Sequence, residues 1–188
     1  MILLQPFNLA NVNIHFEWNN DADLNFYDSD LPHKNESFDS FVKRLKAVTD
    51  PANKSAEIFE IVDDVTGKVI GVIDISNIDP YNHKCEIECT IGNRAYRNKG
   101  YAKTALQEAL RYCFEELDVT RVVTTGFDFN EQWLKLVEKL GFVREGELRN
   151  HALKRGKYCN KFVYGLLREE YKTSKSKWSS KKTARIAS

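Results

Sequence analysis

The sequence has few cysteines and no long apolar run. Its four cysteines are Cys85, Cys89, Cys113 and Cys159. They form no Cys-x-x-Cys pair and have no histidine at zinc-ligand spacing, so free buried thiols are expected and no metal site is predicted. No segment approaches the roughly 20 apolar residues that a membrane span needs. The first residues also lack the basic start of a signal peptide, and we therefore expect a cytoplasmic protein.

The chain also lacks an excess of charge of either sign. Lys and Arg number 28 and Asp and Glu number 27, which leaves a formal net charge of +1 at pH 7. No overall field therefore attracts the protein to nucleic acid or to an anionic membrane, and neither is an expected partner. The length of 188 residues, of which 42% are hydrophobic, predicts one domain with a packed core. We place that domain at residues 1–171 and expect a basic, flexible tail at 172–188.

Hydrophobic periodicity predicts an α/β (α+β) domain with a mixed, mostly antiparallel central sheet flanked by helices. Strands are expected at Ile2–Phe7, Ala56–Val62, Lys68–Asn77, Lys84–Ile91, Arg121–Phe127, Phe142–His151 and Lys157–Leu167. Helices are expected within Leu9–Trp18, after Ser37 up to Val48, at Gly100–Leu117 and at Asn130–Leu140. The polar segment 19–35, interrupted by Pro32, is expected to be a loop of a length that often covers a binding site. Its acidic part, residues 26–30, could face a cationic ligand, although a solvated loop is the simpler interpretation.

The segment before the long helix carries the first functional signal. It reads Tyr96-Arg97-Asn98-Lys99-Gly100-Tyr101-Ala102 and follows the strand that ends at Ile91. A helix N-terminus has amides without intrahelical partners and a partial positive charge, so phosphate can bind there. Gly100 lets the backbone approach a ligand closely, and Arg97, Lys99 and Lys103 add positive charge. The segment predicts a pyrophosphate site, and it matches neither the Walker pattern nor the dinucleotide fingerprint.

This segment, RNKGYA, resembles motif A of the GNAT N-acetyltransferases, Arg/Gln-x-x-Gly-x-Gly/Ala. Further along, NEQW followed by LVEKLGF resembles motif B of the same family. The resemblance extends from about Ile2 to Tyr171, and its WNND start and GELRNH…RGKY end are most similar to the ribosomal-protein and spermidine acetyltransferase branches. It implies a GNAT-like fold that binds acetyl-CoA as cosubstrate and acetylates a primary amine. The acceptor would be a protein N-terminus or a small amine such as a polyamine, and a homodimer stays open.

The resemblance also assigns residues to acetyl-CoA. Two strands, ending at Ile91 and Phe127, would separate and admit the pantetheine arm into an acyl-CoA cleft. The residues bonding pantetheine through their backbone would be Thr90, Ile91 and Gly92, with Gly92 marking a β-bulge. The residues holding the pyrophosphate would be Arg97, Asn98, Lys99, Gly100, Tyr101, Ala102 and Lys103. Asn130 would bond pantetheine or the acetyl region, and Lys135 would contact the nucleotide end.

Amine acetylation needs a group that attracts the ammonium and accepts its proton. The expected strand Lys84–Ile91 alternates, so Glu86, Glu88 and Thr90 share one face. By resemblance, Glu86 holds the acidic position common in this branch, and Glu88 stands where a small residue is usual. Either could be the base or the amine anchor, and we slightly favour Glu88. The alternative is a solvent-facing strand with two ordinary carboxylates.

The usual proton donors for the leaving thiolate are missing. By resemblance, Val137 replaces a tyrosine and Trp133 replaces a serine. The proton would then come from water, from Tyr158 or Tyr164, or from the amine itself. The same replacements allow an alternative function, a noncatalytic sensor that binds acyl-CoA. A third possibility, RNA binding through the basic tail, agrees poorly with the near-zero net charge.

Overall fold

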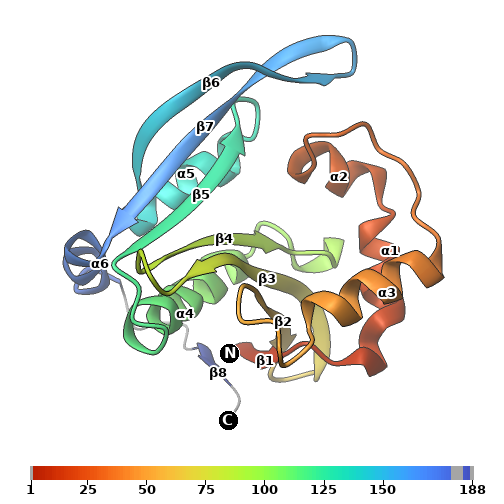
Figure 1. Cartoon of the computed structure of the whole chain (residues 1–188), viewed down its shortest axis with the longest axis horizontal. Coiled ribbons are helices and arrows are strands. Elements are labelled where there is room, and N and C mark those ends of the chain that lie inside the picture. The colour runs from red at the N-terminus through yellow and green to blue at the C-terminus, as the bar shows by residue number, and fades with distance from the viewer. Residues whose placement is uncertain (1, 179–183, 187–188) are drawn as a thin grey trace.

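A computed structural model describes residues 2–178 and 184–186, and within them the strands form one eight-stranded mixed sheet (Figure 1). The strands are β1 (Ile2–Pro6), β2 (Glu57–Asp63), β3 (Lys68–Asp79), β4 (Lys84–Thr90), β5 (Arg121–Phe127), β6 (Val143–Lys154), β7 (Lys157–Leu167) and β8 (Ala184–Ile186). They lie in the order β6-β7-β5-β4-β3-β2-β1-β8. The predicted α/β architecture is confirmed.

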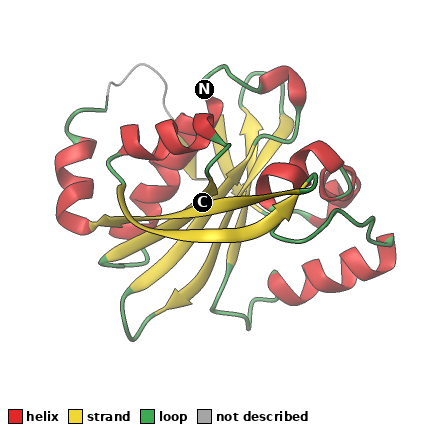
Figure 2. Cartoon of the chain, turned by 90° about the horizontal axis from the view of Figure 1, so that it is seen from above, coloured by secondary structure: helices red, strands yellow, loops and turns green. Residues whose placement is uncertain are grey.

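Helices lie on both sides of the twisted sheet (Figure 2). They are α1 (Val12–Asn19), α2 (Ala22–Asp28), α3 (Phe38–Val48), α4 (Tyr101–Glu115), α5 (Glu131–Leu140) and α6 (Arg168–Lys175), with the 3-10 turns η1 (Leu9–Asn11) and η2 (Arg94–Tyr96). α4 packs against β1, β3, β4 and β5 on one face, and α1 contacts both α2 and α3 at the other side of the molecule.

Short connections explain the order of the central strands. β2, β3 and β4 form an antiparallel meander. Its second turn is closed by the Asp79 side chain, which accepts hydrogen bonds from the amides of Tyr81 and Asn82 at 3.1 and 2.9 Å. β4 and β5 are parallel, which requires a long crossover, and α4 supplies it.

The core lies between the sheet and α4. Strand alternation directs Ile73 and Ile87 to this face, where they are fully buried with Leu106 and Leu110 of the helix. Burial of each such side chain contributes about 1.5–3 kcal/mol. All four cysteines are free within the described residues, as expected, and Cys85 and Cys113 belong to this core.

The segment 19–35, predicted as a loop, contains the helix α2. Asp21 is its N-cap, and the carboxylate accepts from the amides of Asp23 and Leu24 at 2.8 and 3.3 Å. Two turns are too short to give a clear hydrophobic period, which is why the pattern did not reveal the helix.

The domain also differs from the predicted boundary at Tyr171. α6 continues to Lys175, and the Trp178 ring packs edge-on to the Tyr171 ring at 5.7 Å between centroids. Residues 184–186 pair with β1 as a parallel strand. The described part of the predicted tail is therefore attached to the domain. The flexibility predicted for residues 179–183 and 187–188 concerns positions outside the described residues.

Candidate active site

A gap opens in the middle of the sheet, between β4 and β5. These two strands, both described throughout, pair with each other from Lys84 to Glu86 on β4 and from Arg121 to Val123 on β5, and not beyond. β4 continues to Thr90 and β5 to Phe127 (Figure 1). Beyond the last pair, the backbone N–H and C=O groups on the facing edges of β4 and β5 are not bonded to each other. The gap is therefore a slot in which an extended chain with amide groups can bond as a strand does.

The helix that follows β4 begins with an open turn. Gly100 is the N-cap of α4 at φ +84°, and Asn98 precedes it at φ +59°. Glycine and asparagine are the residues that tolerate this left-handed conformation. Thr104 donates its amide and its hydroxyl to the Gly100 carbonyl, each at 3.2 Å. The amides of Ala102 and Lys103 then have no carbonyl one turn earlier in the helix, and residues 98–100 are exposed, so an anion can approach them.

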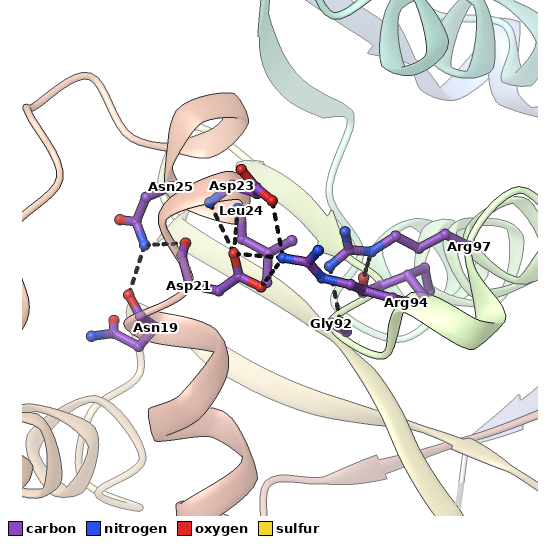
Figure 3. Close-up of polar contacts among 9 residues, drawn as sticks. Asn19, Asp21, Asp23, Leu24, Asn25, Gly92, Arg94 and Arg97 are labelled. Carbon is purple, nitrogen blue, oxygen red and sulfur yellow. Dashed lines mark hydrogen bonds and ion pairs between the residues drawn. The ribbon is translucent and has the colours of Figure 1, made fainter.

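The Arg97 side chain shapes this loop from within. Its Nε donates to the Ile91 carbonyl at 2.8 Å and its Nη2 to the Gly92 carbonyl at 2.9 Å (Figure 3). Beside it, Arg94 forms an ion pair with Asp21 at the start of α2 at 3.1 Å. Part of the Arg97 guanidinium is thus engaged by the loop, and the two carbonyls already accept one bond each. The predicted contacts of these residues with pyrophosphate and pantetheine stay predictions.

Gly92 has a packing reason to be glycine. A Cβ at this position would come within 2.0 Å of the Trp18 ring. The pairing of β3 with β4 is regular from Ser76 to Val72, with Val72 opposite Thr90, and its register shift lies between Ser76 and Asp79. Beyond Thr90, the Asn93 amide donates to the Ile70 carbonyl at 3.1 Å, one residue out of register with the Val72–Thr90 pair. The bulge predicted at Gly92 stays a prediction, and the contact with Trp18 gives a further reason for the glycine.

The motif-B residues have partners inside the protein. The Asn130 side-chain oxygen caps α5, accepting from the Trp133 amide at 3.4 Å. The Trp133 indole N–H donates to the Thr125 carbonyl at 2.8 Å, in the part of β5 beyond its pairing with β4. Lys135 forms an exposed ion pair with Glu131 at 2.7 Å. The predicted contacts of Asn130 and Lys135 with acetyl-CoA stay predictions.

Three carboxylates lie together on the sheet face opposite α4. Asp74 of β3 and Glu88 of β4 are directly opposite each other in the strand pairing. The third is Asp28, the last residue of α2, whose carboxylate accepts from the Thr90 hydroxyl at 3.1 Å. Within the described residues, none of the three forms an ion pair. Glu86, opposite Ser76 on the same face, is exposed, as Glu88 and Asp28 are, whereas Asp74 is partly buried.

This cluster perturbs the titration of its members. Burial, together with the negative charges of Glu88 and Asp28, raises the pKa of Asp74 to about 7. Burial also raises the pKa of Glu88, and the Asp28 charge adds to that shift. The pKa of Asp28 is raised by burial as well, against the Thr90 hydrogen bond. Carboxyl groups whose pKa is raised beside an open slot, Asp74 above all, are candidates for proton transfer.

A cavity of about 220 Å³ adjoins the cluster, between the sheet and the helices α1 to α3. Its apolar wall is formed by Phe7, Trp18, Leu24, Phe41, Leu45, Ile58 and Val72. Its polar wall includes Asp28, Asp74 and Thr90, and Arg44 and His15 also line it. The cavity thus combines an acidic region with an apolar one.

The residues after α2 connect to the β6–β7 hairpin on the far side of the gap. Asp30 forms ion pairs with Lys161 of β7 at 2.7 Å and with His151 of β6 at 3.3 Å. The Lys154 ammonium donates to the Ser29 carbonyl. The segment that the sequence predicted to cover a binding site therefore joins the two sides of the gap.

Of the two candidate tyrosines, Tyr164 lies on the other face of the sheet from the carboxylates. Tyr164 is opposite Thr124 and belongs to the core on the α4 and α5 face, where it is 1% exposed. Its hydroxyl donates to Glu138 at 2.8 Å, and burial together with this bond raises the pKa of Tyr164 to about 12. Tyr158 is 68% exposed near the hairpin tip. The structure therefore separates Tyr164 from Glu86 and Glu88.

Sequence reasoning missed Asp74 and gave Asp28 only as part of an acidic loop. Within the described residues, no group of three His, Cys, Asp or Glu side chains is arranged to hold a metal ion. No helix in the same part of the chain is long and apolar enough to cross a membrane.

Comparison with known proteins adds independent information. Residues 2–143 match the family model described as "Acetyltransferase (GNAT) domain". The chain is 42% identical to the SPbeta prophage-derived uncharacterized N-acetyltransferase YokL of Bacillus subtilis (strain 168), over 40% of this chain and 43% of YokL. It is 26% identical to a spermidine N(1)-acetyltransferase of Vibrio cholerae, over 72% of this chain and 78% of that one. The match to YokL thus spans less than half of that relative.

Solved structures show the same fold. The spermidine N-acetyltransferase from Vibrio cholerae in complex with CoA and spermine superimposes with a TM-score of 0.82. The superposition covers 90% of this chain and 97% of that one at 24% sequence identity. At this identity the likeness establishes the architecture.

Proposed function

The chain belongs to the GNAT acetyltransferase family, and on this premise we propose that it transfers the acetyl group of acetyl-CoA to a primary amine. The observation that carries the proposal is the gap between β4 and β5, followed along the chain by the Gly100 turn. The pantetheine arm is an extended chain with amide groups, which suits strand edges. The pyrophosphate is an anion, which suits the first amides of α4. The solved neighbour that holds CoA supports the assignment.

The carboxylates give the reaction its proton acceptor. A primary alkylamine is protonated at neutral pH, as a lysine side chain is. Glu88 attracts this ammonium and takes one proton from it, and the freed nitrogen lone pair attacks the thioester carbonyl. The C–N bond forms, the C–S bond breaks, and the departing thiolate takes the second proton from the nitrogen. This route needs no tyrosine as a proton donor. It therefore agrees with the presence of Val137, a fully buried apolar residue, at the position where the family resemblance expects tyrosine.

The acceptor, at this level, is a protein N-terminus or a small amine such as a polyamine. Relatives of the chain named spermidine N(1)-acetyltransferases support the second class. A homodimer and a cytoplasmic location stay predictions.

Three measurements test the proposal. Calorimetry with coenzyme A should show binding, and acetyl-CoA mixed with a panel of amines should release free thiol when an acceptor is present. Mass spectrometry of the mixture should identify the acetylated amine. Binding of CoA with no amine-dependent thiol would instead indicate the sensor function, and the absence of CoA binding would overturn both.

A further inference from the structure

The acidic cluster carries more negative charge than the protein itself balances. Asp28 and Glu88 lie close enough to Asp74 for their charges to raise its pKa, and the Asp28 charge also raises the pKa of Glu88. Arg97, Lys154, Lys161 and Arg44 act on them at a distance, without forming an ion pair to any of the three within the described residues. Thr90 gives Asp28 one hydrogen bond, and within residues 2–178 and 184–186 no donor is bonded to the Asp74 carboxylate. Asp28 and Glu88 are exposed and Asp74 is partly buried, so a cation that enters can reach all three carboxylates and would be attracted by them.

The adjoining cavity is chemically uneven. Asp28 accepts a hydrogen bond from Thr90 of β4, the strand that borders the β4–β5 gap, and Asp74 lies on β3, the neighbour of β4, so both are on the side of the cavity nearer the gap. The side formed by α1, α3 and β2 carries Trp18, Phe41 and Ile58, which are aromatic or aliphatic. A molecule filling the cavity would therefore meet carboxylates at one end and, along the rest, mainly apolar side chains, with His15 and Arg44 among them.

We propose that this cavity holds the acceptor, that the acceptor is a primary amine with a single ammonium on an apolar stem, and that Asp74 faces the ammonium from the cavity floor. The proposal rests on the proposed function and narrows it. The stem lies against Trp18 and Phe41, and the ammonium lies among Asp28, Asp74 and Glu88 at the edge of the gap.

A polyamine fits this cavity less well. Its second ammonium would lie beside the apolar wall, where desolvation of a charge is costly. Arg44 also lines that side, and its guanidinium pairs with Glu36 at 2.8 Å. A second ammonium on that side would be repelled by the Arg44 guanidinium, and the Glu36 carboxylate is already paired with Arg44. The cavity thus differs from what the name of the spermine-bound neighbour would suggest for this chain.

Asp74 contributes to the proton balance of the reaction. The ammonium gives one proton to the carboxylate face formed by Asp74 and Glu88, and the neutral amine forms the C–N bond with the acetyl carbon. The C–S bond breaks, the second nitrogen proton goes to the thiolate, and the protonated carboxyl releases its proton to water after the amide leaves. One proton is released for each acetyl group transferred.

Calorimetry of amine binding to the full chain, saturated with CoA, tests the inference without relying on turnover. The probes are 2-phenylethylamine, hexylamine and spermidine, each against wild type, Asp74→Asn, Asp74→Glu and the control Asp64→Asn. Asp64 is an exposed carboxylate in the β2–β3 turn, so its variant makes the same change in net charge. We expect the two monoamines to bind at least about tenfold more tightly than spermidine, because a second charge must be desolvated.

Asp74→Asn should weaken monoamine binding by about tenfold or more, whereas Asp74→Glu should restore part of it and Asp64→Asn should leave it unchanged. Wild-type affinity should rise between pH 6 and 8 as Asp74 ionises, and the rise should be smaller in Asp74→Asn. Preference for spermidine, or equal binding by wild type and Asp74→Asn, would overturn the inference. Thiol release distinguishes failure of this inference from failure of the proposed function. Acetyl transfer to spermidine alone would contradict the inference and leave the proposed acetyltransferase function intact. Monoamine binding at Asp74 without acetyl transfer to any amine would contradict the proposed function and leave the binding site intact.

Discussion

Asp74 of β3 and Glu88 of β4 are a cross-strand pair of like charge on the face of the sheet that borders the cavity. Like charges directly opposite each other destabilise a sheet. Asp28 adds a third negative charge from α2. The fold thus places mutually repelling carboxylates beside a gap in its sheet. This arrangement is expected where binding of a cation matters more than stability.

Because the Asp74 carboxylate is repelled by Glu88 and Asp28, we predict that Asp74→Asn stabilises the folded protein at alkaline pH. The pKa of Asp74 is about 7 in the folded protein and near 3.9 when unfolded, so between these values the folded state holds a proton that the unfolded state has lost. The contribution of protonated Asp74 to the free energy of unfolding is therefore fully present below pH 4 and is lost as the pH rises through 7. The variant should therefore gain free energy of unfolding above pH 7, by up to about 4 kcal/mol.

Urea unfolding at pH 4.5 and pH 8 checks this expectation. The gain should be large at pH 8 and small at pH 4.5, while Asp64→Asn should change little at either pH. A variant less stable than wild type at pH 8 would show that Asp74 is held by favourable contacts rather than by repulsion.

A second prediction concerns the turn at the start of α4. Alanine is strained at positive φ by about 1–2 kcal/mol, so Gly100→Ala at φ +84° and Gly67→Ala at φ +66° should lose similar stability. Gly67 lies in the β2–β3 turn, where an added Cβ would have no atom within 4 Å, which makes it a matched control. We expect CoA affinity to fall about tenfold in Gly100→Ala and to stay constant in Gly67→Ala, as measured by calorimetry. Equal affinities would show that CoA does not use this turn.

The sequence predicted the parts of the site that depend on local pattern. The helix after Gly100 follows from its apolar period and from the glycine before it, and both are present. The separation of the strands ending near Ile91 and Phe127 was implied by the family resemblance, and the strand pairing confirms it. These features can be predicted from a few neighbouring residues or from a known motif, without knowing which distant residues come into contact.

The partner of Asp74 could not be predicted in this way, because a register shift decides which residue of β4 lies opposite it. Counting back from the Asp79–Lys84 pair without a shift would place Asp74 opposite Cys89. The irregularity between Ser76 and Asp79 moves the pairing by one residue and brings Asp74 opposite Glu88. Nothing in the β-branched run of this strand indicates that shift. The contact of Asp28 with Thr90 was equally hidden, since it joins residues 62 positions apart.

Gly92→Ala should disturb both stability and acceptor binding. The new methyl group would overlap the Trp18 ring, which must then move within the wall of the cavity. Overpacking of this kind costs about 1–3 kcal/mol. The melting temperature should fall by several degrees, and binding of 2-phenylethylamine should weaken. Gly146→Ala, with no atom within 4 Å of the added Cβ, is the matched control and should match wild type in both measurements. Unchanged amine binding in a destabilised Gly92→Ala would remove Trp18 from the acceptor site.

The last prediction separates the possible proton donors to the thiolate. Tyr164 is buried, donates to Glu138 and has a pKa raised to about 12, so it holds its proton firmly and points it at a carboxylate. Tyr164→Phe should therefore keep the rate of acetyl transfer within about twofold while losing about 1 kcal/mol of stability with the hydrogen bond. Tyr158→Phe, at an exposed position, should change neither quantity. If instead Tyr164→Phe lowered turnover tenfold at constant CoA affinity, the proton would come through Tyr164, and the amine could not be its source.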